Sequence, residues 1–360
     1  MIMKSPNFFL EDYRNRLIRL QHLFSQWQVD GCIVENPVDL LYLLGLQLSL
    51  GTLIVTQKEA RLFVDGRYLY VAQAKSPVSV STLNEPSLLQ FIQASKLKEL
   101  AFDAHFTTFS RYLKWVELNK GMCKLKPIDS LLQELRVIKE PKEEELLSES
   151  AELLVKAFHH LETKLQTGIT ENNLCLEFEI FCRMQGAEKL AFDSIVAFGK
   201  NSAMPHYRSA DIPLQLGDLI LIDIGVVLNH YHSDMTRVLF WGEPDPLLQK
   251  MLLIVQAAQL AALKECLPGR KLGDLDLAAR AEMRKENMEE YFVHNLGHGI
   301  GLEVHEFPRV GSKTLDKEVR LQEGMVITIE PGLYIPEKGG VRYEDMVLIT
   351  DKGAKKLTRC

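Results

Sequence analysis

The chain has 360 residues, of which 46% are hydrophobic and 25% are charged, and its 48 acidic and 42 basic side chains give a formal net charge of −6. This composition is typical of a folded globular protein and excludes the disordered, collagen-like and low-complexity classes. A mildly acidic chain gives no electrostatic reason to expect nucleic acid or a membrane as a partner. The length predicts two domains, because a single core rarely grows beyond about 250–300 residues.

The sequence also carries information on cellular location. No apolar run reaches the roughly 18–20 residues that cross a bilayer, and the N-terminus lacks the apolar segment of a secretory signal. The six cysteines are scattered along the chain without a Cys-x-x-Cys pair. We therefore expect a soluble, cytoplasmic protein with reduced thiols.

The first part of the chain alternates between helical and extended patterns. Apolar residues recur near a 3.6-residue period from Tyr13 to Val29, which predicts an amphipathic helix. Further helices are expected at residues 67–75 and 108–119, and strands at residues 32–34, 51–55, 60–64 and 97–102. This mixture predicts an α/β domain over residues 1–134.

A second domain, residues 135–360, is predicted to begin with a long helix. Pro141 and the acids after it suit a first helical turn, so we expect a helix that continues to Gln166. Thr170 is a good N-cap for a second helix that ends near Gly186. Helical spacing returns at residues 244–267 and 272–289, and strands are expected at residues 194–198, 219–227, 231–241, 325–334 and 341–350.

Two acids lie on a predicted hairpin in the middle of the second domain. An apolar strand that carries Asp223 turns at residues 228–230 and returns as a strand that carries Asp234. In a hairpin with a two-residue turn, paired positions sum to an odd number, so these two acids share a face. Two ionised acids side by side repel each other, and a metal cation would remove the conflict. The alternative is that Asp223 pairs with an arginine or caps a backbone group.

The same arrangement occurs again near the C-terminus. Two apolar strands carry Glu330 and Glu344 and are joined by a loop that contains Gly339 and Gly340. The two acid positions sum to an even number, which suits a three-residue turn and again places both side chains on one face. Asp345 has the opposite parity and should point away. Two such pairs favour a metal site over a chance juxtaposition.

A segment rich in histidine and glycine lies between the two hairpins. His294, His298 and His305 fall within twelve residues, with glycines at positions 297, 299 and 301. Because glycine disfavours a helix interior, the first two histidines do not form the helical zinc-binding pair of HExxH sequences. A lone histidine is more often structural, but three of them beside an acid-rich site indicate that at least one is a metal ligand.

The order and wording of these motifs resemble the pita-bread metallopeptidases. The five residues that match the metal ligands of that family are Asp223, Asp234, His298, Glu330 and Glu344. The sequences Ser-Asp-Met-Thr-Arg, Gly-His-Gly-Ile-Gly-Leu-Glu-Val-His-Glu, Ile-Glu-Pro-Gly-Leu-Tyr and Val-Arg-Tyr-Glu-Asp resemble its proline-specific branch, aminopeptidase P and prolidase. The resemblance covers residues 135–360, and the front domain is similar, more weakly, to the creatinase-type N-terminal domain of that branch.

The resemblance implies a fold and a cofactor. The catalytic half would be a pseudo-two-fold α/β fold, a curved antiparallel sheet backed by helices, which would explain why an acid-bearing hairpin occurs twice. Asp234 and Glu344 would bridge two divalent metal ions. Asp223 would chelate one ion, while His298 and Glu330 would complete the other. Four carboxylates and one imidazole favour Mn²⁺, with Co²⁺ or Zn²⁺ as alternatives.

The resemblance also implies catalytic roles. The nucleophile would be a hydroxide bound to the two metal ions, and Glu330 would be both a ligand and a proton acceptor. His206 and His305 match positions that stabilise the tetrahedral intermediate and guide the substrate carbonyl.

Three further residues match positions around the substrate pocket, namely His294, Tyr334 and Arg342. For Arg342, the alternative is a simple ion pair with Glu344 or Asp345.

These implications predict an aminopeptidase P, acting as a homodimer on small peptides with proline at the second position. Such peptides need a dedicated enzyme because an X-Pro bond has no N–H and carries a ring that blocks the usual extended binding mode. A Xaa-Pro dipeptidase (prolidase) is the alternative, whereas the front domain and the Val-His-Glu wording disfavour methionine aminopeptidase. A non-catalytic peptide-binding module is more remote. A mononuclear iron oxygenase using His294, His298 and one acid would leave three carboxylates without a role.

Overall fold

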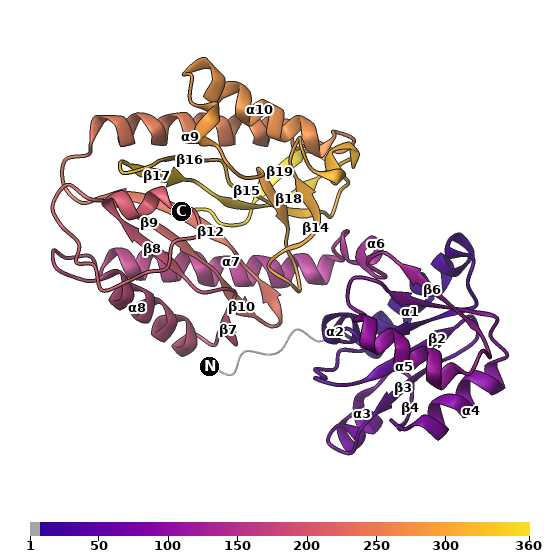
Figure 1. Ribbon diagram of the computed structural model, residues 1–360. Coiled ribbons are helices and arrows are strands. Elements are labelled where there is room, and N and C mark those ends of the chain that lie inside the picture. The colour runs from indigo at the N-terminus through magenta and orange to yellow at the C-terminus, as the bar shows by residue number, and fades with distance from the viewer. Residues whose placement is uncertain (1–7) are drawn as a thin grey trace. The chain divides into compact units, whose positions relative to one another are not determined.

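The computed structural model describes residues 8–360, and these form two compact units (Figure 1). The first unit ends at Arg136, and the second spans Val137–Cys360. The boundary predicted from the sequence lies after residue 134. The N-terminal stretch that we judged for a secretory signal begins outside the described residues.

The N-terminal unit contains a six-stranded mixed sheet with strand order β4-β3-β2-β1-β5-β6. Its strands are β1 (Gly31–Val34), β2 (Thr52–Thr56), β3 (Ala60–Val64), β4 (Ser79–Thr82), β5 (Glu99–Asp103) and β6 (Lys124–Ile128). Its helices are α1 (Leu10–Trp27), α2 (Pro37–Leu44), α3 (Leu69–Lys75), α4 (Glu85–Ser95), α5 (Phe109–Asn119) and α6 (Gln133–Arg136). The predicted α/β character is confirmed. The sequence patterns missed α2, α4, α6, β4 and β6; helix α2 is short and apolar on nearly all sides, so its sequence shows no helical period.

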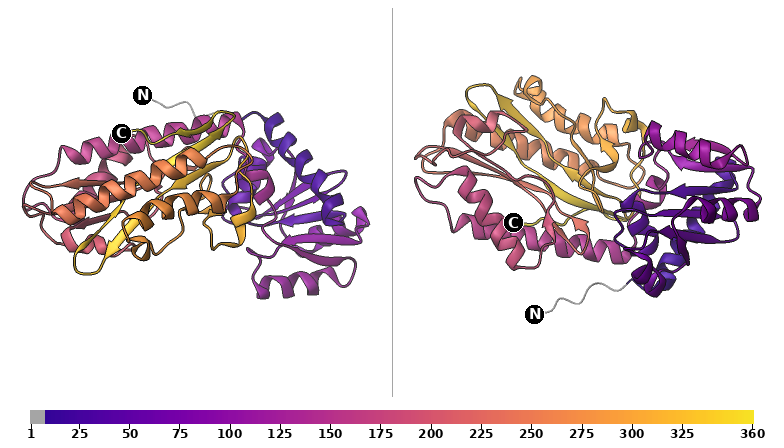
Figure 2. Two further views of the ribbon diagram at one scale, coloured as in Figure 1. Left: turned by 90° about the horizontal axis from the view of Figure 1, so that it is seen from above. Right: turned by 60° about the horizontal axis from the view of Figure 1, so that its bottom comes forward.

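The C-terminal unit places antiparallel strands between two pairs of helices. Its helices are α7 (Pro141–Glu162), α8 (Glu171–Met184), α9 (Pro246–Glu265) and α10 (Leu272–Lys285). Its strands are β7 (Lys189–Leu190), β8 (Ile195–Phe198), β9 (Leu219–Ile224), β10 (Val226–Leu228), β11 (Tyr231–His232), β12 (Met235–Phe240), β13 (Gly297–Gly299), β14 (Glu306–Val310), β15 (Val326–Ile329), β16 (Gly332–Ile335), β17 (Gly339–Arg342), β18 (Asp345–Thr350) and β19 (Gly353–Lys356). Three short 3₁₀ helices complete it: η1 (Gly199–Ala203), η2 (Glu289–Tyr291) and η3 (Leu315–Glu318). In Figures 1 and 2, α9 and α10 cover one side of the strands and α7 and α8 cover the other.

Strand β9 shows why its sequence is almost continuously apolar. Leu219 and Leu221 belong to the core that also contains the buried faces of α9 and α10. Ile220 and Ile222 point the other way, into the core that α7 and α8 cover. A strand buried on both faces loses the polar alternation of a surface strand. Asp223 therefore stands out as an acid within a fully buried strand.

The register of the first acid-bearing hairpin is the one predicted. Leu228 pairs with Tyr231 across the two-residue turn Asn229-His230, whose φ angles of 50° and 72° fit a tight hairpin turn. The same register continues along β9 and β12, where Asp223 pairs with Thr236. Asp234 is two residues before Thr236 and hence shares the face of Asp223.

The second hairpin also has the predicted parity, but its turn lies elsewhere. Ile335 pairs with Gly339 across a three-residue turn, residues 336–338. The prediction that Gly339 and Gly340 form the loop was wrong, because both begin strand β17. Glycine is needed at position 340, since a Cβ there would lie 2.2 Å from the carbonyl oxygen of Ser202. The close approach of η1 to this strand thus explains a glycine that we had attributed to a turn.

Element boundaries also differ in the predicted long segments. Helix α7 ends at Glu162, not at Gln166, and helix α10 ends at Lys285. Thr170 caps α8 as predicted, because its hydroxyl accepts a hydrogen bond from the Asn173 amide. Strands β7, β13, β14 and β19 were missed; β13 is a three-residue glycine-rich strand that only its neighbours in the sheet define.

Helix α9 is the single helix within residues 8–360 whose length and hydropathy would suit a membrane span. This is weak indication of a span, because the core helix of a soluble protein has the same properties. Met251, Val255, Ala258 and Ala262 are fully buried in the core between α9, α10 and the strands. The apolar character of α9 is therefore explained by packing within the unit.

Candidate metal centre and active site

Four acids and one histidine, proposed from the sequence as metal ligands, lie in or next to five different strands. Asp223 lies in β9, Asp234 directly precedes β12, and His298 lies in β13. Glu330 directly follows β15, and Glu344 directly precedes β18. Asp223 and Asp234 lie on the face of their hairpin opposite to Ile222 and Met235, which pack with α7 and α8. Glu330 and Glu344 lie on the face opposite to Ile329 and Val347, which pack with α9 and α10. Each pair thus faces away from the helices that cover its own half, so the two pairs share the interior between the halves.

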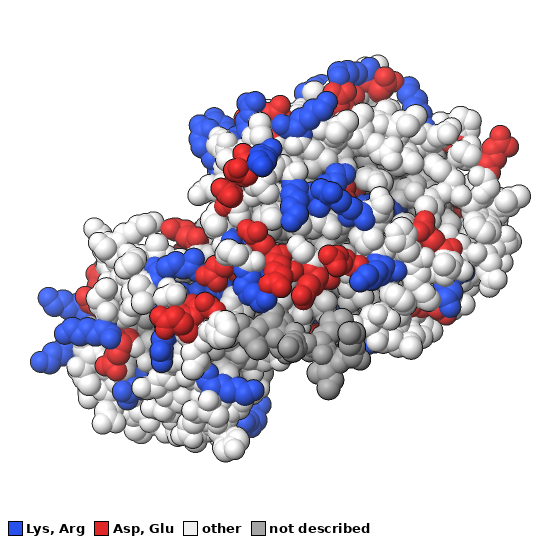
Figure 3. Space-filling model, turned by 180° about the vertical axis from the view of Figure 1, so that it is seen from behind, with Lys and Arg blue, Asp and Glu red and all other residues white. Residues whose placement is uncertain are grey.

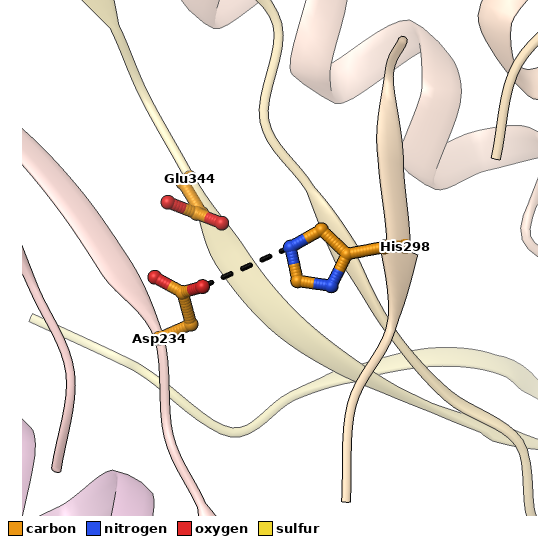
Figure 4. Close-up of side chains that lie close together, drawn as sticks. All are labelled: Asp234, His298 and Glu344. Atoms are coloured by element: carbon orange, nitrogen blue, oxygen red, sulfur yellow. Dashed lines mark ion pairs between the residues drawn. The ribbon is translucent and has the colours of Figure 1, made fainter. Parts of the chain in front are cut away.

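The five side chains converge on a small volume. Ligating atoms of Asp234, His298 and Glu344 all lie within 4.8 Å of one another (Figure 4). The His298 Nε2 atom is 3.8 Å from Asp234 Oδ2 and 3.5 Å from Glu330 Oε1. Asp223 joins the group through the electrostatic effect of its charge on Asp234, Glu330 and Glu344.

His298 is oriented as a ligand. Its Nδ1 atom lies 3.0 Å from the carbonyl oxygen of Gly299, which can only accept a hydrogen bond, so Nδ1 carries the proton. The lone pair of Nε2 then points towards the acids. Burial, together with the charge of His305, lowers the pKa of His298 to about 3. The imidazole is therefore neutral at physiological pH, as a metal ligand must be.

The acids are held in a strongly unfavourable electrostatic environment. Burial raises the pKa of Asp234 well above its usual value, and the charges of Glu344, Asp223 and Glu330 raise it further. Burial and the charge of Glu344 likewise raise the pKa of Glu330. Burial and the charge of Asp223 raise the pKa of Glu344 to about 7. Without a bound cation, some of these groups must be protonated at neutral pH.

The donor set fits divalent metal ions. Asp223 Oδ1 and Asp234 Oδ1 are fully buried and, among the described residues, have no hydrogen-bond partner. A buried carboxylate oxygen without a hydrogen-bond partner destabilises the folded protein. Both atoms belong to the acid cluster, where a cation would satisfy them and lower the pKa of the neighbouring acids at the same time.

Arg342 is connected to the cluster, but not by either ion pair that we considered for it. It pairs with Asp223 instead, and its Nε atom donates to Thr236 Oγ1 at 3.0 Å. Its Nη1 atom donates to the Tyr334 hydroxyl at 2.9 Å. The alternative interpretation of Asp223, an arginine partner, is thus correct for one oxygen of this acid, while the other oxygen has no partner.

Tyr334 links Arg342 to His294. The His294 Nδ1 atom lies 2.7 Å from the Asn295 carbonyl oxygen and must donate to it, so Nε2 accepts from the Tyr334 hydroxyl at 2.9 Å. Burial lowers the pKa of His294 to about 4 and raises that of Tyr334 to about 12. All three side chains that the sequence assigned to the pocket therefore form one hydrogen-bonded chain, with a neutral imidazole at its end.

Of the remaining two predicted catalytic residues, His305 lies beside the acid cluster and His206 lies near His305. The rings of His305 and His298 are in edge contact, with centroids 4.3 Å apart. Burial and then the charge of His206 lower the pKa of His305, so these two histidines lie near each other. A cavity of about 710 Å³ opens next to His294 and includes charged groups of both signs, Lys313, Glu289 and Glu290 among them.

Two threonines orient the acids and were missed in the sequence. Thr236 Oγ1 donates to Glu344 Oε2 at 2.6 Å, and Thr328 Oγ1 donates to Glu330 Oε1 at 3.3 Å. Each threonine lies two residues from a predicted ligand on the same strand, so the parity that placed the acids could also have placed them. Hydrogen bonds of this kind fix the direction in which a ligand offers its lone pairs.

Comparison with known families agrees with this geometry. Residues 145–351 match the model of metallopeptidase family M24, and residues 16–138 match the creatinase/prolidase N-terminal domain. The chain belongs to metallopeptidase family M24, and the predicted pita-bread family is confirmed.

Similar proteins are found over nearly the full length. The chain is 34% identical to the Xaa-Pro dipeptidase of Pyrococcus furiosus, over 96% of this chain and 98% of that protein. The structure of a Xaa-Pro dipeptidase from Bacillus anthracis matches with a TM-score of 0.93 and 30% identity, covering 97% of this chain and 98% of that one. An X-Pro aminopeptidase from Thermotoga maritima matches with a TM-score of 0.87 and 30% identity, over 95% and 98% of the two chains.

Proposed function

We propose that this metallopeptidase is a Xaa-Pro dipeptidase, which hydrolyses the bond between an N-terminal residue and a C-terminal proline. The observation that carries the proposal is the convergence of three buried acids, the partly buried Glu330 and a neutral imidazole in a chain that resembles dipeptidases over nearly its whole length. The sequence alone favoured aminopeptidase P. The names of the relatives support the alternative hypothesis, a dipeptidase, better, although one of the similar structures is an X-Pro aminopeptidase.

The five residues Asp223, Asp234, His298, Glu330 and Glu344 would hold the divalent cations. When bound, such ions lower the pKa of a water molecule and polarise the scissile carbonyl. Four carboxylates make the site a hard one, which supports Mn²⁺ over softer metals.

The side chains of this protein contribute positioning and proton transfer. Glu330 is the most exposed of the four acids: its side chain is 18% exposed, against 12% for Asp223 and 7% for Asp234. It is therefore the carboxylate best placed to accept a proton from an attacking water. The imidazoles of His206 and His305 would offer hydrogen bonds to a developing oxyanion. The single N–H of neutral His294 already donates to the Asn295 carbonyl oxygen, so this ring would line the pocket instead.

Arg342 supports the site by holding Asp223 and Tyr334 at the same time. A planar guanidinium can serve several acceptors in fixed directions, which an ammonium cannot. The hydrogen-bonded chain from Arg342 through Tyr334 to His294 would therefore fix the pocket side of the site before substrate enters.

The partners, the cellular location and the oligomeric state are proposed next. Lys and Arg are interspersed with Asp and Glu on the face shown in Figure 3, which differs from the basic stripe of a nucleic-acid-binding surface. We propose small peptides as the partners, a cytoplasmic location and a homodimer. Sedimentation would test the dimer, and fractionation of cells would test the location.

The substrate class is tested by comparing a free Xaa-Pro dipeptide with the matching Xaa-Pro-Yaa tripeptide, with Mn²⁺ added. A dipeptidase site is complementary to the carboxylate directly after proline, so we expect kcat/KM at least about tenfold higher for the dipeptide. A preference for the tripeptide would establish aminopeptidase P instead. The control is the corresponding Xaa-Ala dipeptide, and its equal cleavage would contradict proline specificity.

Metal analysis distinguishes an enzyme from a binding scaffold. Protein purified without chelators should contain about two divalent ions per chain and lose hydrolysis when they are removed. A protein without metal and without hydrolysis would favour the peptide-binding module.

A further inference from the structure

Glu171 is a completely buried acid outside the metal centre. It occupies the first position of α8, directly after the N-cap Thr170, and has no solvent-exposed surface. Its carboxylate accepts four hydrogen bonds, all from neutral groups. The four donors offset the free-energy cost of burying this carboxylate. The carboxylate in turn holds the groups that donate to it.

The four donors bracket one segment of the chain, residues 199–210. At its start, the Phe198 amide and the Asn201 side chain donate to Oε1 at 2.8 and 3.1 Å. At its end, the Tyr207 hydroxyl and the Ala210 amide donate to Oε2 at 2.9 and 3.0 Å. One carboxylate thus fastens both ends of the segment to the N-terminus of α8.

The segment carries His206 between these two attachment points. Asn201 Nδ2 also donates to the Tyr207 hydroxyl at 3.1 Å, which joins the start of the segment directly to the neighbour of His206. Ser202 Oγ accepts from the Gly340 amide at 2.8 Å, so the segment also contacts strand β17. His206 itself is exposed. Its position is therefore determined by the backbone that Glu171 holds.

We propose that Glu171 is a positioning residue, which fixes the 199–210 segment so that His206 stands beside His305 at the substrate carbonyl. This inference rests on the proposed peptidase function, because it assigns to His206 a role in the reaction. Glu171 touches neither the substrate nor the acid cluster and acts only through the segment.

The chemistry requires a carboxylate at this position. A glutamine offers one oxygen, so its amide nitrogen would face either the Phe198 amide or the Ala210 amide, both of which can only donate. Glu171→Gln should therefore release one end of the segment while it preserves the volume of the side chain. Glu179→Gln is the matched control, since Glu179 lies on the same helix and forms a 3.7 Å surface ion pair with Arg183.

The test is a double-mutant cycle on Xaa-Pro hydrolysis with Glu171→Gln, His206→Ala and the double variant. We expect Glu171→Gln to lower kcat by about tenfold or more with a smaller change in KM, as for residues that orient catalytic groups. In the His206→Ala background, the same change should have little further effect, because the residue through which Glu171 acts is absent. Glu179→Gln should be indistinguishable from the unmodified protein in both backgrounds.

Two outcomes would overturn the proposal. The first is an additive cycle, in which Glu171→Gln lowers kcat by the same factor with and without His206, as a general structural defect would. The second is unchanged hydrogen exchange of residues 198–210 in Glu171→Gln, a measurement that needs no substrate. A wild-type protein that does not cleave Xaa-Pro peptides at all would instead contradict the proposed function, which keeps the two failures apart. Tyr207→Phe removes a single donor and provides a milder variant if Glu171→Gln does not fold.

Discussion

At strand β18, two neighbouring buried acids face opposite sides of the sheet and have different electrostatic surroundings. Glu344 faces the acid cluster, where Asp223, Asp234 and Glu330 repel it. Asp345, the next residue, faces away and accepts hydrogen bonds from Arg237, Lys356, Gln259 and Thr358 at 2.6–3.0 Å.

The two faces differ in how far protein cations neutralise the buried acids. The charge of Asp345 is neutralised by Arg237 and Lys356, so this acid does not need a bound metal ion. The four acids on the other face have Arg342 as their cationic hydrogen-bond partner, and two of their oxygens have no partner within residues 8–360. On the metal face a single arginine is paired with four acids, and metal ions can supply the positive charge that is missing there.

The largest expected effect comes from removing a charge on the metal face. Asp234→Asn should lower kcat/KM by about 10³-fold or more, because a metal ion contributes several kcal/mol to catalysis and each 1.4 kcal/mol is a factor of ten. Steady-state kinetics and metal analysis would check this. Equal metal content and activity in the variant would show that the two faces do not differ as described.

The matching change on the other face should affect stability instead. Asp345→Asn leaves the buried Arg237 guanidinium without its carboxylate, and breaking a buried pair costs about 3–5 kcal/mol. Denaturant unfolding would measure the loss. Activity per folded molecule should fall much less than in Asp234→Asn; a variant with unchanged stability would contradict the role that we give to Asp345.

A third prediction concerns the metal-free protein. The pKa of Glu344 is raised to about 7 by burial and by Asp223, so the folded state binds a proton that the unfolded state has released above about pH 4.3. Stability supplied by this proton is lost as pH rises from about 4.5 through 7.

Comparison with Glu344→Gln measures this contribution together with the effect of the Glu344 charge on Asp234 and Glu330, whose pKa values it raises. In the presence of chelator, the variant should gain about 3 kcal/mol of unfolding free energy relative to the unmodified protein between pH 4.5 and 8. Unfolding curves across this pH range would measure it. A difference that does not change with pH would show that the empty cluster does not repel Glu344.

The smallest effect is expected from the arginine that bridges the metal face. Arg342→Lys keeps the charge, but a lysine cannot serve Asp223, Tyr334 and Thr236 together, so activity should fall by about 10–100-fold. Arg237→Lys is the control on the other face and should mainly lower stability. Kinetics and thermal unfolding of both variants would show whether the two arginines differ in this way.

Position numbers along the chain are enough to say which residues share a face. Alternation along a strand has a period of two, so Asp223 and Asp234, and likewise Glu330 and Glu344, could be placed from position numbers alone, and Asp345 could be placed on the opposite face. The ligand types and the family followed from short contiguous motifs. These are local properties, which need no knowledge of distant contacts.

Contacts between residues far apart in the chain could not be predicted in this way. Arg342 could have paired with either acid beside it, yet it pairs with Asp223, 119 residues away in the chain. Glu171 gave no pattern in the sequence, although it holds the segment that carries His206. Partners of this kind depend on how separate strands and helices pack against each other, and a parity rule along one strand does not contain that information.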